Sequence, residues 1–463
     1  MKNKFFFCYV LIAYLCVCST IVGQQTLSEV TYPNHIVDEI IHTTTYNSST
    51  ATVSYMDMDT ARCFSYADNS YSVINLWLPP AIKVSDFKII DDSWVVFCGS
   101  DTTPMATKAV LGLFKIANFF STSPTYLIYD NFLFGSDTVR YLHSLVAYQE
   151  SNIYHIVMTG TLGNEATGPS ALVLDLTAQN MGSSWNYETG ISSLTGETLT
   201  NICLTDKYVV TAGNYDQSLY SETYRVHKRS DIFMTGGTEN TIHHFTPNLG
   251  FPYSHNYRGF KMTHMTEDTI AVANYYTKPT SPTNLNAVLF VFNVGDFVNY
   301  PSTQTAYLWT LSLTTSSFTI NDLVYNDNSR RLALLVEGQL LYSAQSMILD
   351  IPVSSTIINY SAVNFDDVSI KTADKFGMNY VAQGISIAND HVSVFFSKPF
   401  GTPSLCKPDN LLPIVNYWND SKQFDAPFII KSNTIVCTEV DFPNKSFAPK
   451  EVICNQKRQS ERQ

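Results

Sequence analysis

Short runs of alternating apolar and polar residues recur along this chain, and each follows an acidic or amide residue. The runs IIDDSWVVFCGS (89–100) and LTDKYVVTAGN (204–214) share one plan: Asp, one residue, an aromatic residue, Val-Val, two residues and Gly. Looser copies follow. The anchors are separated by 59, 55, 61, 61 and 62 residues, at Asp92, Ser151, Asp206, Glu267, Asn328 and Asp390. A fixed period of this size is typical of a solenoid, a propeller or an array.

The rest of each period favours a propeller. In the period around Asp92, strand-like runs occupy 86–90, 94–100, 109–116 and 125–132, with polar turns between them. Four short strands per period describe one propeller blade. No stretch shows a convincing 3.6-residue apolar period, which excludes helical solenoids. The pattern therefore predicts an all-β protein with a single β-propeller.

The repeated acidic residue is interpreted as a turn residue. Asp and Asn in tight turns can accept hydrogen bonds from backbone N–H groups one or two residues further on. The Val-Val pair that follows predicts an inner strand, packed between two neighbouring blades and hence apolar on both faces.

The two ends of the repeat decide the number of blades. Six periods are visible, residues 52–78 hold three further strand-like runs, and residues 428–441 hold a pair. Joining these segments in one blade would close the ring without an open edge. We therefore predict seven four-stranded blades over residues 50–442, with six blades as the alternative. Residues 24–49 are predicted to be an N-terminal extension, and 443–463 a C-terminal tail.

In its repeat plan the chain resembles the secreted β-propeller superfamily over residues 50–442. The Gly-His and Trp-Asp marks of WD40 repeats, the paired glycines of kelch repeats and the boxes of sialidases are missing. The resemblance therefore implies a fold and supplies no functional residues.

The N-terminus predicts export. Lys2 and Lys4 precede an apolar run from Phe5 to about Val17 and small residues ending at Gly23. This is the pattern of a signal peptide over residues 1–23, with an uncleaved anchor as the alternative. We expect a secreted, periplasmic or extracellular monomer without a membrane span. The net charge is −12 and no basic stripe is present, which argues against nucleic acid as a partner.

The cysteines fit an exported chain. Six of the nine lie beyond the predicted signal peptide, and an even number permits disulfides. Cys63 lies in the N-terminal strand set and Cys437 in the last strand pair. If one blade holds both, a disulfide between them would lock the ring, with Cys406 and Cys454 as rival partners of Cys437.

No local catalytic motif is present, and we predict no cofactor and no metal site. Candidates for ligand contact are a row on one strand face and three tyrosines beside long polar loops: Arg225, His227, Arg229, Tyr215, Tyr275 and Tyr276. The composition favours a module that binds a protein or a glycan through loops on one face. A polysaccharide hydrolase or lyase with carboxylates from several blades, and a structural surface protein, are the alternatives.

Overall fold

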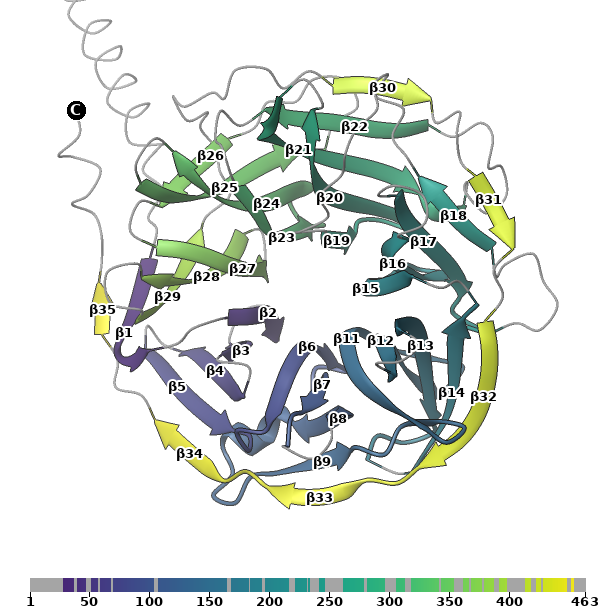
Figure 1. Ribbon diagram of the computed structural model, residues 1–463. Coiled ribbons are helices and arrows are strands. Elements are labelled where there is room, and N and C mark those ends of the chain that lie inside the picture. The colour runs from purple at the N-terminus through teal and green to yellow at the C-terminus, as the bar shows by residue number, and fades with distance from the viewer. Residues whose placement is uncertain are drawn as a thin grey trace, which may run out of the picture.

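The computed structural model shows a ring of β-sheets around a central axis (Figure 1). The parts that it describes are residues 28–36, 40–46, 51–56, 59–67, 70–103, 107–164, 168–182, 184–193, 196–215, 221–230, 232–233, 241–245, 261–278, 281–295, 305–312, 318–340, 343–353, 361–365, 368–376, 379–386, 391–397, 413–417, 422–425, 428–447 and 451–453. The predicted all-β class and the propeller are confirmed. Nowhere in these ranges is a helix long and apolar enough to cross a membrane.

The strands of the described residues pair into seven sheets, and consecutive strands of each repeat are antiparallel neighbours. In chain order, the first sheet contains β2 (Ile40–Tyr46), β3 (Ala51–Met56), β4 (Thr60–Ala67) and β5 (Ser70–Trp77), and the second contains β6 (Ile82–Ile90), β7 (Trp94–Asp101), β8 (Lys108–Lys115) and β9 (Thr125–Tyr129). The third sheet contains β10 (Leu133–Phe134), β11 (Asp137–Glu150), β12 (Ile153–Asn164), β13 (Gly168–Ala178) and β14 (Trp185–Ser192). The fourth contains β15 (Glu197–Leu204), β16 (Tyr208–Tyr215), β17 (Ser221–Lys228) and β18 (Thr241–Phe245). A short 3-10 helix, η1 (Ile116–Phe119), follows β8.

The other three sheets continue around the ring. They contain β19 (Lys261–His264), β20 (Thr269–Lys278), β21 (Ser281–Asn293) and β22 (Thr305–Ser312); β23 (Phe318–Asn326), β24 (Arg331–Leu340), β25 (Ser343–Pro352) and β26 (Ser361–Phe365); and β27 (Val368–Phe376), β28 (Asn379–Ser386), β29 (His391–Ser397) and β1 (Ser28–Ile36). The N-terminal strand β1 thus completes the last sheet by pairing with β29.

The C-terminal segment runs around the outside of the ring, drawn in yellow in Figure 1. We call its strands the outer belt: β30 (Pro413–Tyr417), β31 (Lys422–Asp425), β32 (Phe428–Ile435), β33 (Thr438–Asp441), β34 (Asn444–Phe447) and β35 (Glu451–Ile453). In this order they pair antiparallel with β22, β18, β14, β9, β5 and β1. The belt therefore adds a strand to six sheets, one after another around the ring, in the direction opposite to that in which the repeats follow one another. In each sheet it pairs with the outermost strand.

The belt and β1 correct three predictions. Most sheets hold a fifth strand, because the belt adds one to the four supplied by the repeat. Residues 428–441 do not pair with 52–78, since β2 to β5 already form a complete set of four and β1 supplies the closing strand of the last sheet. Strand pairing also extends beyond the expected limits of 50 and 442, to Ser28 and Ile453.

The repeated Val-Val pair packs as predicted between neighbouring sheets. Val95 and Val96 in β7 are both 0% exposed. Val95 belongs to a cluster shared with β4 and β5, and Val96 to a cluster shared with β11 to β14. Because successive side chains of a strand point to opposite faces, the pair joins one sheet to both of its neighbours.

Five of the six anchors lie in or beside the turn between the innermost strand of their sheet (β6, β11, β15, β19 or β23) and the strand that follows it. The physical reason differs from the predicted hydrogen bonding at Asp92, where φ is 47°, and at Ser151, where φ is 50°. Ser151 and Asn152 form a two-residue loop between Glu150 and Ile153, whereas the loop with Asp92 has three residues between Ile90 and Trp94. Both loops hold residues at positive φ, which Asp and Asn tolerate. The sixth anchor, Asp390, lies outside the described residues.

A bulge explains the repeated glycine. The ladder between β15 and β16 shifts register after Leu199, opposite Gly213. A Cβ on Gly213 would lie 1.7 Å from the carbonyl oxygen of Thr198. Gly99 holds the same place opposite a bulge in β6, and a Cβ there would also overlap backbone. The glycine therefore allows the innermost strand to bulge.

Candidate functional site

The strands nearest the centre of the ring carry a polar residue after each bulge. In β6 this residue is Asp86, whose Oδ1 accepts hydrogen bonds from the N–H of Phe87 (2.8 Å) and from Nζ of Lys88 (3.2 Å). Its Oδ2 accepts from Oγ of Ser144 (2.7 Å) and the N–H of Leu145 (3.0 Å), both in β11. Burial alone would raise the pKa of Asp86, but the charge of Lys88 and these hydrogen bonds outweigh it and lower the pKa.

Asp322 in β23 has the same role. Its Oδ1 accepts from the N–H of Leu323 (2.9 Å), and its Oδ2 accepts from Oγ1 of Thr372 (2.9 Å) and the N–H of Ala373 (3.0 Å) in β27. Asp86 and Asp322 therefore hydrogen-bond the innermost strand of their own sheet to the innermost strand of the next sheet, β6 to β11 and β23 to β27. Both precede their turn anchor by six residues, a regularity that the sequence contained and that we did not use.

These two carboxylates lack the properties of the catalytic pair that the alternative function, a polysaccharide hydrolase, would need. The general acid of such an enzyme has a raised pKa, whereas the pKa of Asp86 is lowered. Both oxygens of Asp86 and of Asp322 already accept hydrogen bonds within the ring. The two residues thus stabilise the contact between sheets.

The predicted row on β17 is mostly buried. Arg225 is 1% exposed and lies against Glu197, which is 0% exposed. Its Nε donates to Oε1 of Glu197 (2.9 Å) and its Nη2 to Oε2 (2.7 Å), while Nη2 also donates to Oγ of Ser192 (2.9 Å). His227 is 3% exposed. A ligand in solvent therefore cannot contact Arg225 or His227, because the strand face that carries both side chains is buried.

His227 makes stability depend on pH. Burial, and then the charge of Arg225, lower its pKa from 6.5 to about 4. The neutral ring bonds through Nδ1 to the carbonyl oxygen of Ile232 (3.1 Å). Protonation of His227 is harder in the folded state than in the unfolded state. The contribution of His227 to the free energy of unfolding is therefore complete above pH 6.5 and is lost as the pH falls through 4, by about 3 kcal/mol. Urea unfolding of the wild type and of His227→Gln should show this difference in pH dependence; equal dependence would contradict it.

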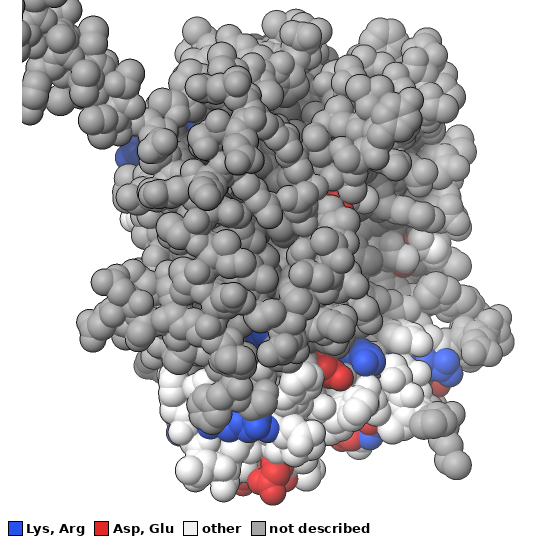
Figure 2. Space-filling model, turned by 90° about the vertical axis from the view of Figure 1, so that its left-hand side faces the viewer, with Lys and Arg blue, Asp and Glu red and all other residues white. Residues whose placement is uncertain are grey.

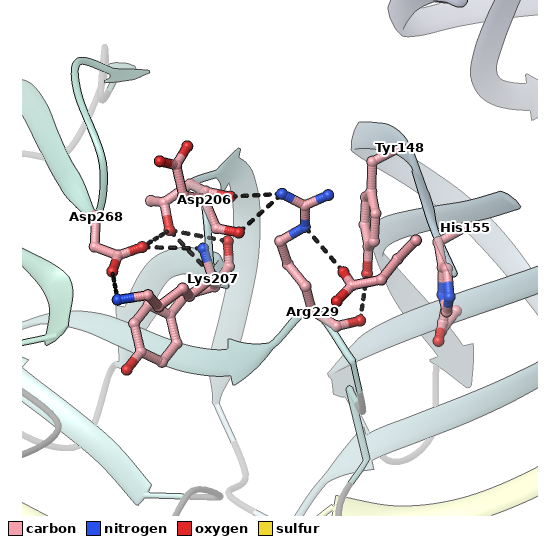
Figure 3. A network of polar contacts seen from close by, with 10 residues as sticks. Tyr148, His155, Asp206, Lys207, Arg229 and Asp268 are labelled. Carbon is pink, nitrogen blue, oxygen red and sulfur yellow. Dashed lines mark hydrogen bonds and ion pairs between the residues drawn. The ribbon is translucent and has the colours of Figure 1, made fainter. Parts of the chain in front are cut away.

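Arg229, the third member of the row, lies in a network between three sheets (Figure 3). Its Nη1 donates to the carbonyl oxygen of Asp206 (2.9 Å), and its Nε is 3.2 Å from Oε2 of Glu150. Its guanidinium carbon lies 4.7 Å from the ring centroid of Tyr148. The guanidinium therefore joins the β15–β16 turn to the end of β11.

The same turn is joined to the next sheet. The N–H of Lys207 and Oγ1 of Thr205 donate to Oδ1 of Asp268 (3.0 and 3.1 Å), and the Lys207 ammonium lies 3.4 Å from Oδ2. The N–H of Asp206 donates to the carbonyl oxygen of Glu267 (3.1 Å). Turns from neighbouring sheets thus form a hydrogen-bonded surface on one side of the ring.

A polar pocket of about 470 Å³ adjoins this surface. His155 connects the two, since its ring stacks on Tyr148 at 5.0 Å with 3° between the planes. Nδ1 of His155 lies 3.2 Å from Oδ1 of Asp175. The pocket is lined by residues of β12, β13, β14, β32 and the segment after β17: His155, Asp175, Thr177, Asn186, Tyr187, Glu188, Ser230, Ile232, Ser432, Asn433 and Thr434.

Strand register arranges the pocket in two rows. The first crosses β13, β14 and β32 through Asp175, Glu188 and Ser432, and the second through Thr177, Asn186 and Thr434. Oγ of Ser432 donates to Oε1 of Glu188 (3.2 Å), and Oγ1 of Thr434 to Oδ1 of Asn186 (3.3 Å). The belt strand β32 therefore supplies one wall. Sequence reasoning missed these residues, because the rows join segments about 250 residues apart.

The remaining predicted residues contribute no described contact to this pocket. Tyr215 belongs to β16, and Tyr275 and Tyr276 to β20, but their side chains lie outside the described ones. The described part of the face in Figure 2 carries interspersed Lys, Arg, Asp and Glu without a continuous basic patch. Within the described residues no group of His, Cys, Asp and Glu could hold a metal ion.

The predicted Cys63–Cys437 disulfide is wrong. Both cysteines are free. Cys63 is buried in β4 among residues shared with β6 to β9, whereas Cys437 follows β32 and packs against the cluster between β7 and β13. The prediction assumed that both ends of the chain meet in one blade, and the belt places Cys437 elsewhere. Cys406 and Cys454 lie outside the described residues.

Comparison with known proteins finds structural likeness only. No family model and no curated protein matches the sequence. The β-propeller domain of Cps50 (Swd1) from Myceliophteria thermophila is 6% identical, with a TM-score of 0.44, over 79% of this chain and 98% of that one. The WD40 repeats of RRP9 are 10% identical, with a TM-score of 0.35, over 80% of this chain and 98% of that one. With TM-scores below 0.5, the propeller assignment rests on the strand pairing of the chain itself.

Proposed function

We propose that the protein is a secreted β-propeller, with the seven sheets as its blades, that binds a protein or a glycan through one face. The pocket beside the Arg229 network carries the proposal. Its polar side chains are already held by one another, as in the pairs His155–Asp175 and Ser432–Glu188. Binding then immobilises few side chains, which lowers its entropic cost. Secretion rests on the pattern of residues 1–23.

One observation favours a second function, hydrolysis of a polysaccharide. Asp175 and Glu188 are directly opposite each other on adjacent strands, where Cβ atoms lie about 5 Å apart, so two carboxyl groups are close together, as a glycosidase requires. Both, however, belong to one row of one sheet, whereas the two catalytic carboxyls flank the scissile bond. The aromatic residue in the lining, Tyr187, is 2% exposed and offers no platform for a sugar ring. Binding therefore accounts better for the pocket.

A photo-crosslinking experiment tests the proposal. A photoreactive residue replaces Ser432 in the pocket or, as a control, exposed Glu439 on β33. After exposure to extracellular proteins and to a glycan array, we expect the probe at position 432 to crosslink a specific partner. The double variant Asp175→Asn/Glu188→Gln should lose this crosslink, whereas the control Glu439→Gln should keep it. Equal capture at both positions would contradict binding at the pocket. Release of reducing ends from a polysaccharide, abolished in the double variant, would establish the hydrolase instead.

A further inference from the structure

The negative charge of the residues that line the pocket indicates which class of partner it binds. Two carboxylates line it, those of Asp175 and Glu188, and its described lining contains no Lys or Arg. We propose that the pocket accepts a cationic side chain, Lys or Arg, presented by a protein partner. This inference rests on the proposed binding function and chooses a protein over a glycan.

The two carboxylates suit different parts of such a side chain. Asp175 is 7% exposed and pairs with His155, whereas Glu188, opposite it on β14, is exposed and accepts a hydrogen bond from Ser432. A cation can therefore reach Glu188 from solvent, and a charge-assisted hydrogen bond that it makes to the more buried Asp175 is stronger because the effective dielectric constant is lower there. Hydroxyl and amide oxygens of Thr177 and Asn186 offer further acceptors for N–H donors.

The cations nearest in sequence to the pocket walls are engaged elsewhere. Arg229 precedes Ser230 in the wall, but its guanidinium forms an ion pair with Glu150 and donates a hydrogen bond to the carbonyl oxygen of Asp206. Lys431 precedes Ser432, and its ammonium lies 4.5 Å from the ring centroid of Phe134. Neither of these two cations belongs to the lining of the pocket, in which Asp175 pairs with His155.

The aromatic residues of this region argue against a sugar. Tyr187 is 2% exposed and Tyr148 is 5% exposed beneath the ring of His155. Ile232, from the segment after β17, is equally buried at 3% exposed, so the described lining offers polar groups and not a stacking surface.

Saturation-transfer NMR with small probes tests this inference on the full chain. The probes are the N-acetyl methylamides of L-lysine, L-arginine and L-norleucine, with putrescine as a free amine and glucose as a sugar. We expect the lysine and arginine probes to bind at least tenfold more tightly than norleucine or glucose. Glu188→Gln should weaken them about fivefold and Asp175→Asn about tenfold, while Glu439→Gln changes nothing.

Three results would overturn the inference of a cationic partner. They are equal binding of the lysine and norleucine probes, binding that Glu188→Gln leaves unchanged, and binding of putrescine ten times tighter than that of the lysine probe, which would assign the pocket to a free amine.

Glu188 is exposed, so its variant should fold, and a thermal melt verifies this. If the cationic probes fail while the crosslinked partner still depends on Asp175 and Glu188, the cation inference falls and the binding function stands. If that dependence is also missing, both fall.

Discussion

Truncation of the chain after Val436 is expected to lower the melting temperature by roughly 3–5 °C. The cut removes β33 to β35 and with them Phe442, which is 7% exposed. Its ring centroid lies 4.8 Å from that of Tyr126 and 5.3 Å from that of Phe114. Loss of a buried Phe side chain costs about 3–5 kcal/mol, and the cut also leaves the edges of β9 and β5 unpaired, a risk for aggregation.

A graded series separates the belt from a general effect of shortening the chain. Truncation after Phe447 removes only β35 and should cost least, while truncation after Leu412 removes all six belt strands and should cost most. The measurement is thermal unfolding by circular dichroism, with light scattering to detect aggregation. Identical melting temperatures for the three truncated chains and the full chain would contradict a belt that stabilises the ring.

Replacement of Glu197 by Gln is expected to destabilise the fold by about 3–5 kcal/mol. The Arg225 guanidinium is 1% exposed and makes two hydrogen bonds to this carboxylate. Without the negative charge, a buried cation remains uncompensated, and an uncompensated buried charge costs far more than the pair itself contributes. Urea unfolding of both proteins measures the difference.

Two further variants control this prediction. Glu439→Gln removes a carboxylate that is exposed on β33, and we expect a change within about 0.5 kcal/mol. The double variant Glu197→Leu/Arg225→Met removes both charges and should recover most of the lost stability, because apolar pairs often replace buried ion pairs at little cost. A cost below about 1 kcal/mol for Glu197→Gln would show that Arg225 is not held by this pair.

The repeat itself could be predicted from the sequence, because it depends on local chemistry. Alternation marks the strands, the Val-Val pair marks a strand buried on both faces, and Asp92 marks a hairpin with positive φ. These signals lie within about ten residues of one another. The bulge opposite Gly213 was also present as a pattern, but its meaning depends on a carbonyl oxygen of the neighbouring strand.

The belt and the pocket could not be predicted in this way. The belt strands are short and pair with partners more than 80 residues away, and nothing local distinguishes their outer edge position. Arg225 and His227 look like an exposed row in sequence, but the partners that bury them, Glu197 and Ile232, come from β15 and from the loop after β17. The pocket combines Asp175 and Glu188 with Ser432, a combination that only the belt creates.

The register of β32 on β14 tests the account most directly, since both the belt and the pocket depend on it. Asn186 and Thr434 are directly opposite each other, at a separation that a disulfide can bridge. In the variant Asn186→Cys/Thr434→Cys, oxidation followed by peptide mass spectrometry should find these two cysteines joined, whereas Asn186→Cys/Glu439→Cys should remain unlinked. Two alkylatable thiols at 186 and 434 in the folded, oxidised protein would contradict the belt and the pocket together.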